Sequence, residues 1–451
     1  MCYLILQMKT VNQRGIFMDV KKVRREGKYA IYEVRIELDE SKSMLDQEMA
    51  IQEAVNAVGC EATKDALKNF DTTGNTLMVN GIKYTGKGLQ NEDYECPYGR
   101  IGVERQVYQN SRGGRIFCPM ENAARIISSA TPKFAKLLSY KYGNSGCREA
   151  AQDLMESTGR AICTAYIQTV SEMVGSVAQF LDPEDIYELP TGIPAPAQIA
   201  ISLDGTCMLM VKDGWREAMT GTISLYDAAG ERIHTIYVGA APEHGKGEFT
   251  ARFEREIQRV KATYPDAEYI GLADGAATNW DFLKKYTNKS ILDFYHASEY
   301  VKLAANAMFS GEKKQNMKKE WIENSLHNLK HKNGAAKRLL NEFIAHRQKT
   351  TKYYRTDMES AITYFINHYR KMNYAMQAKI NMPIGSGIVE AACKELIKQR
   401  MANSGMRWKE KGASIVISIR SLILSGKRWE QFWEKISESG CPAHREFAEI
   451  K

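Results

Sequence analysis

The sequence lacks long apolar runs and closely spaced cysteine pairs, and each absence excludes a class of protein. No stretch reaches the roughly 18 consecutive apolar residues that a membrane-spanning helix requires, so no transmembrane helix is expected. The nine cysteines are scattered, and none forms a C-x-x-C pair. An odd, dispersed set in a long chain favours reduced thiols in the cytoplasm over a disulfide framework. Cys96 and Cys118 could form half of a zinc site, but no second pair stands nearby, and buried free thiols are the preferred interpretation.

The N-terminus also lacks the features of a secretory signal. The first ten residues, MCYLILQMKT, contain a short apolar patch without a basic segment before it and without a small-residue cleavage site. We interpret them as mature sequence or as the product of a start codon assigned upstream of Met18.

Positive charge is present in excess and is concentrated in one segment. The 451 residues are 44% hydrophobic and 26% charged, a composition typical of a soluble globular protein of two to four domains. The net charge is +8, yet residues 297–382 alone contain sixteen Lys or Arg against seven Asp or Glu, a net charge of +9. A concentrated basic region favours a polyanionic partner, although a solvated helix surface would give the same pattern.

Residues 1–189 are expected to form a mostly helical region with a small β element. Alternating residues predict strands at 30–41 and 101–109, and apolar residues at helical spacing predict a helix over 43–70.

The segment at about 147–172 has the pattern of a helix-turn-helix. One helix would cover 147–157, Gly159 would form the turn, and a second helix would begin near Ala161. A helical hairpin that serves only packing is the alternative, because helix pairs with a glycine turn are common.

A proline-rich stretch separates this region from a segment in which strands are expected to alternate with helices. Pro190, Pro194 and Pro196 predict a stiff linker at 190–197. Three strands with short turns follow, and then helices and strands alternate. The order β-β-β-α-β-α-β-α predicts an α/β domain with a mixed sheet covered by helices. The expected strands lie in QIAISLDGTCMLMVK, MTGTISLYDA, ERIHTIYVGAA, AEYIGLADGA and SILDFYHA, and the first helix covers 248–265.

Two acidic residues stand on the expected sheet. Asp204 lies in SLDG within the first strand, and Asp274 lies in LADG at the C-terminal end of the fourth. Ligands gather at the C-terminal ends of strands in open α/β sheets. Asp-Gly is also a favoured turn dipeptide, so each acid alone could mark a turn. Two such acids, after strands that we expect to be neighbours, favour a functional site.

A third acid, Glu390, stands among small and apolar residues in PIGSGIVEAACK. If Ser386 caps a helix, Glu390 could simply stabilise the first turn. Helical spacing instead places it beside Cys393, Ile397 and Met401, on the face expected to pack on the sheet. A buried carboxylate needs a partner, and a pair of divalent cations such as Mg²⁺ or Mn²⁺, shared with the other two acids, would provide one.

These motifs resemble the ISKra group of bacterial insertion-sequence transposases, members of the DDE superfamily with an RNase H-like catalytic core. The resemblance is strong over about 200–433 and loose in the N-terminal part. It implies that Asp204, Asp274 and Glu390 form the catalytic, metal-binding triad and that two Mg²⁺ or Mn²⁺ ions are the cofactors. The matching stretches are SLDG, KDGWREAMTG, LADGAATNW, ILDFYHASEYV, PIGSGIVEAACK, RMANSGMRW and RWEQFW.

Asp293 and His296 in ILDFYHA match a further family feature: Cys or Asp, two residues and His after the second catalytic acid. The resemblance implies auxiliary residues and not metal ligands. The residue types could pair, position DNA or tune the metal site, and a structural hydrogen bond is the alternative.

The long gap between Asp274 and Glu390 exceeds what an RNase H-like core needs, so the resemblance implies an all-helical insertion at 297–382. Its basic residues interleave with aromatics, which suits a DNA backbone or an unpaired base, although aromatics also form helix cores. Arg407 with Trp408 would suit a DNA groove, with a core role for Trp408 as the alternative. The candidate DNA-binding residues are Arg407, Trp408, Lys394, Lys398, Arg400, Lys318, Lys319, Arg148 and Arg160.

The resemblance thus implies a DNA transposase that binds the terminal repeats of its element. It would cleave and join double-stranded DNA at transposon ends and target as a homodimer or larger oligomer in the bacterial cytoplasm, at the nucleoid. A transposase-derived DNA-binding protein without cleavage and a cellular RNase H-fold nuclease are the alternatives. The expected layout is a DNA-binding or oligomerisation region at 1–189, the linker at 190–197, a catalytic domain at 198–296 and 383–433 around the insertion, and a tail at 434–451.

Overall fold

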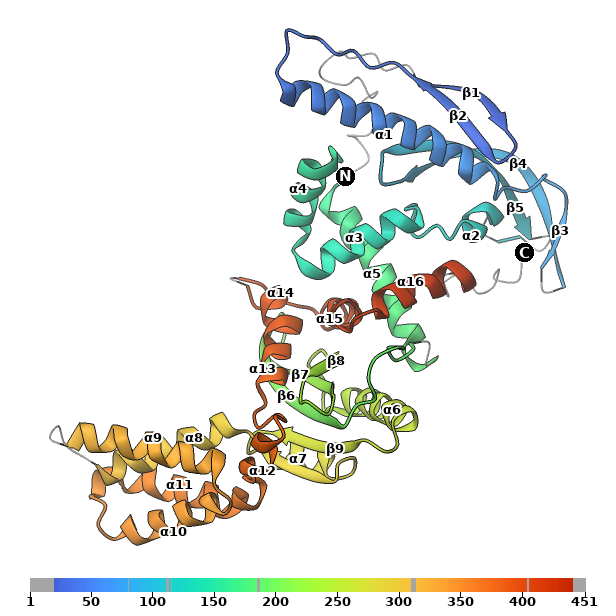
Figure 1. The fold of residues 1–451 in the computed structure, drawn as a ribbon. Coiled ribbons are helices and arrows are strands. Elements are labelled where there is room, and N and C mark those ends of the chain that lie inside the picture. The colour runs from blue at the N-terminus through green and yellow to red at the C-terminus, as the bar shows by residue number, and fades with distance from the viewer. Residues whose placement is uncertain are drawn as a thin grey trace. The chain divides into compact units, whose positions relative to one another are not determined.

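Figure 1 shows the computed structural model of the chain, which describes residues 20–440 apart from 80, 111–112, 115, 185–186, 310–313 and 404. The interpretation of the first residues, and the thiols of Cys2 and Cys441, lie outside this range. The chain divides into two compact units: the first runs up to Phe180 and includes the chain from Trp433 onward, and the second spans Leu181–Phe432. The division precedes the proline-rich stretch at 190–197. No helix within the described range is long and apolar enough to cross a membrane.

The first unit combines helices with two antiparallel sheets, β1-β2 and β3-β4-β5. The helix predicted over 43–70 is confirmed, and the Ser43 side chain caps it by accepting from the Asp46 N–H. The strand predicted over 30–41 ends early, at Val34. The strands are β1 (Val20–Glu26), β2 (Tyr29–Val34), β3 (Leu77–Val79), β4 (Ile82–Glu95) and β5 (Arg100–Asn110), and the helices are α1 (Met44–Lys68), α2 (Pro119–Ala123), α3 (Pro132–Asn144), α4 (Cys147–Thr158) and α5 (Thr164–Leu181).

The predicted turn between α4 and α5 forms at Gly159. Its φ of 68° lies in the left-handed region, where glycine has no steric penalty, and it caps α4. The second helix begins at Thr164 and not near Ala161. Cys96 and Cys118 are buried free thiols, as preferred from the sequence.

The second unit is built on a five-stranded mixed sheet of order β10-β9-β6-β7-β8. β6, β7 and β8 pair antiparallel, whereas β9 and β10 run parallel to β6. The predicted order β-β-β-α-β-α-β-α is confirmed. Its elements are β6 (Gln198–Met210), β7 (Gly214–Tyr226), β8 (Arg232–Ala240), α6 (Gly247–Thr263), β9 (Glu268–Ala273), α7 (Ala277–Leu283), β10 (Lys289–Leu292) and α8 (Phe294–Met308).

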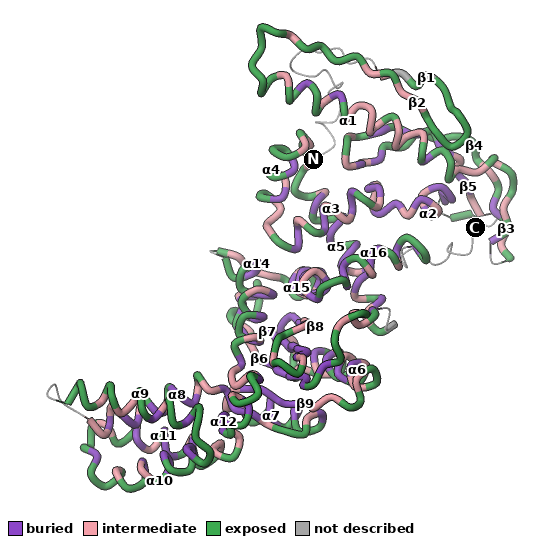
Figure 2. The backbone as a smooth tube through the Cα atoms, in the orientation of Figure 1, coloured by how far each residue is buried: buried purple, intermediate pink, exposed green. Residues whose placement is uncertain are grey.

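The sheet is covered by the apolar faces of its helices, and Figure 2 shows the buried residues gathered on the strands and on helix faces. β6 is buried without interruption from Gln198 to Leu203, as expected for a central strand covered on both faces. Along α6, Phe249 and Phe253 are at most 1% exposed, and burying each ring contributes roughly 2–3 kcal/mol. A Cβ at Gly221 of β7 would come within 2.8 Å of the Phe253 ring, so glycine is needed there.

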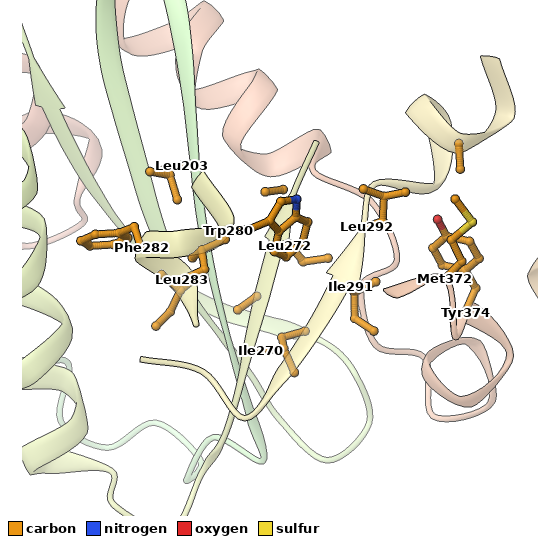
Figure 3. Close-up of a cluster of buried hydrophobic side chains, with 14 of the residues drawn as sticks. Leu203, Ile270, Leu272, Trp280, Phe282, Leu283, Ile291, Leu292, Met372 and Tyr374 are labelled. Carbon is orange, nitrogen blue, oxygen red and sulfur yellow. The ribbon is translucent and has the colours of Figure 1, made fainter. Parts of the chain in front are cut away.

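The part of this core around α7 fixes the chain that carries Asp274. Trp280 is 2% exposed, and its Nε1 donates to the Asp274 carbonyl oxygen at 2.8 Å. Figure 3 shows Trp280 among side chains from several strands and helices of the second unit, so the position of this indole is set by packing on many sides. The other labelled side chains of this cluster are Leu203, Ile270, Leu272, Phe282, Leu283, Ile291, Leu292, Met372 and Tyr374.

Between β10 and Glu390 the described chain is helical, as expected for 297–382. Phe343 and Phe365 pack edge to face, and Trp321 lies partly buried with its Nε1 bonded to Glu342. Tyr354 and Tyr364 also pack against the core, whereas Tyr353 is 84% exposed. Trp321, Tyr354 and Tyr364 therefore serve helix packing, the alternative named for the aromatic residues of this segment, whereas Tyr353 does not. After α8 come α9 (Gln315–His331), α10 (Ala335–Arg347), η3 (Lys352–Tyr354), α11 (Arg355–His368), η4 (Tyr369–Lys371) and α12 (Tyr374–Lys379).

The chain then returns to the sheet through a helix that changes its geometry. α13 (Gly387–Ala392) leads directly into η5 (Cys393–Lys398), which is a π-helix, and then into α14 (Gln399–Met401). Arg420, 4% exposed on α15, donates to the carbonyl oxygens of Glu395 and Leu396 in η5. These bonds satisfy carbonyls within the π-helix. The last helices are α15 (Glu410–Leu424) and α16 (Arg428–Ser439).

Candidate functional site

The register of two parallel strands places Asp204 and Asp274 at equivalent positions. β6 and β9 are paired up to Ser202, which lies opposite Leu272. Asp204 and Asp274 each come two residues after this last pair, Asp204 within β6 and Asp274 just past the end of β9. Because side chains alternate between the faces of a sheet, this register directs both carboxylates to the same face. Asp274 directly follows β9, so its predicted place at the C-terminal end of a strand is confirmed.

Backbone and amide groups orient the Asp274 carboxylate. Its Oδ1 accepts from the Ala276 N–H at 3.0 Å and from Asn279 Nδ2 at 3.5 Å. Asn279 Nδ2 also lies 3.4 Å from the carbonyl oxygen of Leu203, the residue before Asp204. Asn279, 7% exposed, therefore ties the two acidic positions together. No role for Asn279 was predicted from the sequence, where its amide stands out as a polar group on a helix face that otherwise carries Trp280 and Leu283.

Asp204 is half-buried and is oriented from two sides. Its Oδ1 accepts from the Gly205 N–H at 2.7 Å, and the Cys393 thiol lies 3.8 Å from its Oδ2. Burial and the nearby Asp204 charge raise the pKa of Cys393 to about 12, so this thiol stays protonated and serves as a hydrogen-bond donor.

The pKa of Asp204 is raised by its environment. Burial is the largest cause, and the negative charges of Asp274 and Glu390 raise the pKa further. The Gly205 N–H opposes this shift by stabilising the ionised form. Asp274 and Glu390 thus both act electrostatically on Asp204, a pattern that is typical of functional sites.

The expectation that Glu390 is buried was wrong. Its side chain is exposed, whereas Val389, Ala392 and Cys393 face the interior of the second unit. The prediction extended α-helical spacing from Glu390 to Ile397 and Met401, but the π-helix η5 changes the turn within that stretch. Ile397 and Met401 are buried as expected, and Glu390 lies at the edge of a cavity instead.

A cavity of about 630 Å³ lies between β6 and the α13–η5 segment. Asp204 and Glu390 both line it, together with Thr206, Lys394 and Lys398. Within the part of the chain that the structure describes, no three His, Cys, Asp or Glu side chains stand close enough to form a metal-binding group. Asp204 and Glu390 therefore line the same cavity, but their side chains, as placed, do not form a complete set of metal ligands.

The donor set at this cavity nevertheless fits a hard divalent cation. Carboxylate oxygens are the ligands that Mg²⁺ and Mn²⁺ prefer. The raised pKa of Asp204 shows that negative charge there lacks full compensation. A cation bound there would relieve this repulsion.

The basic candidates fall into two groups by exposure. Lys394 and Lys398 are exposed on the cavity rim, and Arg407 and Lys319 are exposed elsewhere on the second unit, with Lys318 partly so. Arg148 is exposed on α4 of the first unit. These six side chains remain available to an external partner.

The other candidates are held inside the protein. Arg160 forms an ion pair with Glu95, lies over the Phe134 ring and is only 11% exposed. Arg400 is 3% exposed beneath the Trp408 ring, with its guanidinium 5.2 Å from the ring centre. We therefore correct the interpretation of Arg160 and Arg400 as surface contacts, because both guanidinium groups are used in packing.

Trp408 is also structural. Its Nε1 donates to the Met401 carbonyl at 2.9 Å, and its backbone bonds to Leu209 and Val211 at the end of β6. The core role named as an alternative for this indole fits its contacts better than free stacking on a base.

Asp293 and His296 differ in their surroundings. Asp293 is fully buried, and its Oδ1 accepts from the backbone N–H of His296 at 2.7 Å as the cap of α8. The imidazole of His296 is 42% exposed, and its Nδ1 lies 3.8 Å from Glu299. The Asp293 carboxylate thus binds the backbone of His296, whereas the imidazole lies near Glu299.

Two residues of the insertion reach the acidic edge of the sheet. A Cβ on Gly275, next to Asp274, would meet the Tyr364 ring at 2.9 Å and His368 Nε2 at 3.4 Å. Burial and Lys371 lower the pKa of His368, and Asp274 opposes the shift. The end of α11 therefore packs beside Asp274, a contact between distant segments that the sequence analysis missed.

Comparison of the chain with protein-family models and with curated proteins finds no match.

Proposed function

We propose that the chain is a DDE-type DNA transposase that binds the ends of its own element and uses divalent cations to cleave and join DNA strands. The observation that carries the proposal is the placement of Asp204 and Asp274 at equivalent positions of neighbouring parallel strands, with Glu390 across the same region. The strand order β10-β9-β6-β7-β8, in which β7 runs antiparallel to both β6 and β8, supports an RNase H-like core.

Each acid has a definite task in this proposal. Asp204 and Asp274 would hold the cations jointly from the sheet, and Glu390 would complete one site from α13. Two Mg²⁺ or Mn²⁺ ions, about 3.5–4 Å apart, would activate the attacking oxygen and stabilise the leaving one. Asn279 and Gly205 orient the carboxylates by the hydrogen bonds described above, which lowers the cost of assembling the ligands.

The remaining residues supply binding. Lys394 and Lys398 on the cavity rim would contact DNA phosphates beside the acids. The insertion, with its net charge of +9, would follow the DNA backbone, and the first unit would contribute end recognition and assembly into a homodimer or larger oligomer. This activity belongs in the bacterial cytoplasm, where the DNA is.

The test is strand cleavage of duplex DNA that contains the sequences flanking the gene, with Mg²⁺ present. Wild type is expected to cut, whereas Asp204→Asn, Asp274→Asn and Glu390→Gln are each expected to lose at least a hundredfold in rate. Asp227→Asn is the control, because its carboxylate caps a turn through the Ala229 and Glu231 N–H groups. Cleavage by all three variants at the wild-type rate would refute the proposed active site. DNA binding without any cleavage would favour a DNA-binding protein derived from a transposase.

A further inference from the structure

We infer that Asp293 and Ser386 form a latch that positions the Glu390 carboxylate, so that both are positioning residues for the proposed metal site. The inference rests on the proposed function, because it assigns a role relative to Glu390. It begins with the hydrogen bonds of the buried Asp293 side chain.

Asp293 joins the starts of two helices that are far apart in sequence. Its Oδ1 accepts from the His296 N–H at the start of α8, and its Oδ2 accepts from the backbone N–H of Ser386. The Ser386 hydroxyl lies 2.7 Å from the same Oδ2. Ser386 is the cap residue of α13 and is 4% exposed. The Asp293 carboxylate therefore receives donors from the first turn of α8 and from the cap residue of α13.

Neighbouring contacts hold the same two segments together. The Phe294 N–H donates to the Ile384 carbonyl oxygen at 3.0 Å. A Cβ on Gly385 would lie 3.3 Å from Asp293 Oδ2 and 3.2 Å from the Tyr295 ring, so the absence of a side chain at Gly385 allows this close approach. The two ends of the helical insertion are thus closed against each other beside the acidic region.

Ser386 extends this arrangement to Glu390. The Ser386 hydroxyl lies 3.0 Å from Glu390 Oε1, and the Glu390 N–H donates to the Ser386 carbonyl oxygen at 3.1 Å. A hydroxyl has one proton and can donate to one carboxylate at a time. When it donates to Glu390, Asp293 keeps its two backbone N–H donors. The hydroxyl can therefore orient Glu390 without leaving the buried Asp293 carboxylate uncompensated.

The latch assigns separable roles to the two side chains. Asp293 fixes where α13 begins, because it binds the backbone of Ser386. The Ser386 hydroxyl then restrains the carboxylate one helical turn later. Residues that orient a metal ligand in this way typically change metal affinity by about 10–100-fold when they are replaced.

The test measures Mn²⁺ affinity by electron paramagnetic resonance together with hydrogen exchange of residues 383–392, so that activity is not needed. Ser386→Ala is expected to weaken Mn²⁺ binding about tenfold, and Ser386→Thr, which keeps the hydroxyl, to restore it. Asp293→Asn is expected to speed exchange at the Ser386 amide and to weaken Mn²⁺ binding as well. Ser43→Ala, which removes the α1 cap, is the control and should leave Mn²⁺ affinity unchanged.

The outcomes separate the latch from the proposed function. If Glu390→Gln weakens Mn²⁺ binding but Ser386→Ala and Asp293→Asn do not, the latch is wrong and the metal site stands. If Glu390→Gln itself leaves Mn²⁺ affinity unchanged, Glu390 is not a metal ligand. Both the latch and the proposed role of Glu390 in the metal site are then wrong. A thermal midpoint for each variant identifies any that fail to fold, and loss of binding in Ser386→Thr equal to that in Ser386→Ala would also count against the hydroxyl.

Discussion

The charged side chain of Asp204 lowers the stability of the folded state. It is half-buried next to two other acids, and its pKa is raised by burial first and by those charges second. An acid whose native pKa exceeds its unfolded value, about 3.9, binds its proton more tightly in the native state. Stability therefore falls as pH rises through the window between the two values, and it stays lower above that window.

Replacing Asp204 by Asn is accordingly expected to stabilise the protein at pH 7 in the presence of a chelator. The expected gain is at most about 1 kcal/mol, because the site is partly exposed and solvent screens the charges. The gain should vanish below about pH 4, where the wild-type carboxyl is protonated. Urea unfolding at several pH values measures this.

The turn carboxylate of Asp227 provides the matched control, since Asp227→Asn removes a charge that caps a turn. It is expected to be neutral or slightly destabilising at pH 7. A loss of stability in Asp204→Asn at pH 7 would contradict the account of Asp204 as an electrostatically strained residue.

At the scale of elements, the α13–η5 segment decides where Glu390 points. A π-helix has five-residue hydrogen-bond spacing and often marks a functional site. Here Arg420 binds the carbonyl oxygens of Glu395 and Leu396 from α15. Burial lowers the pKa of Arg420 to about 10, so the guanidinium remains protonated at neutral pH and can keep these bonds.

Arg420→Met is expected to destabilise the second unit by about 2–4 kcal/mol, because it leaves buried carbonyl groups without donors. Urea unfolding measures the loss. Arg347→Met removes an Arg that is 55% exposed in its ion pair with Glu359, and it should cost no more than about 0.5 kcal/mol. Equal effects of the two substitutions would show that Arg420 does not stabilise η5.

The same segment shows which parts of the fold could be predicted from sequence. The eight elements from β6 to α8 follow local signals, namely alternation, helical spacing and turn residues, and their order was predicted correctly. The exposure of Glu390 was predicted wrongly because a π-helix leaves no mark in residue spacing. Arg160 pairs with Glu95 and Asn279 reaches the Leu203 carbonyl oxygen, both in distant parts of the chain, so the sequence could not reveal these contacts. Arg400 lies beneath the Trp408 ring, which is close in sequence, but residue spacing does not show that the intervening chain folds back to bring the two together.

At the scale of the whole molecule, positive charge and acidic residues occupy different places. The chain carries a net charge of +8, and its insertion carries +9, whereas the cavity is lined by Asp204 and Glu390. A basic surface attracts DNA through phosphate contacts, and such binding weakens as salt rises. In the proposed function, the acids would then act at one place along a bound duplex.

Replacing both Lys318 and Lys319 by Ala is expected to weaken DNA binding and to lower the slope of log K against log salt by about 1–2. Fluorescence anisotropy with a labelled duplex at several salt concentrations measures this slope. Lys284 and Lys285, which are exposed just before β10 at the end of the sheet opposite Asp274, provide the control pair. If the slope of log K against log salt fell only when Lys284 and Lys285 were replaced, DNA binding by the insertion would be contradicted.

The central claim is that Asp204, Asp274 and Glu390 hold divalent cations together, and direct measurement of Mn²⁺ bound per chain tests it most directly. Wild type bound to DNA is predicted to take up two ions. Asp204→Asn and Asp274→Asn are each predicted to lose at least tenfold in affinity for both ions, and Glu390→Gln for one of them. Unchanged stoichiometry and affinity in all three variants would contradict the account.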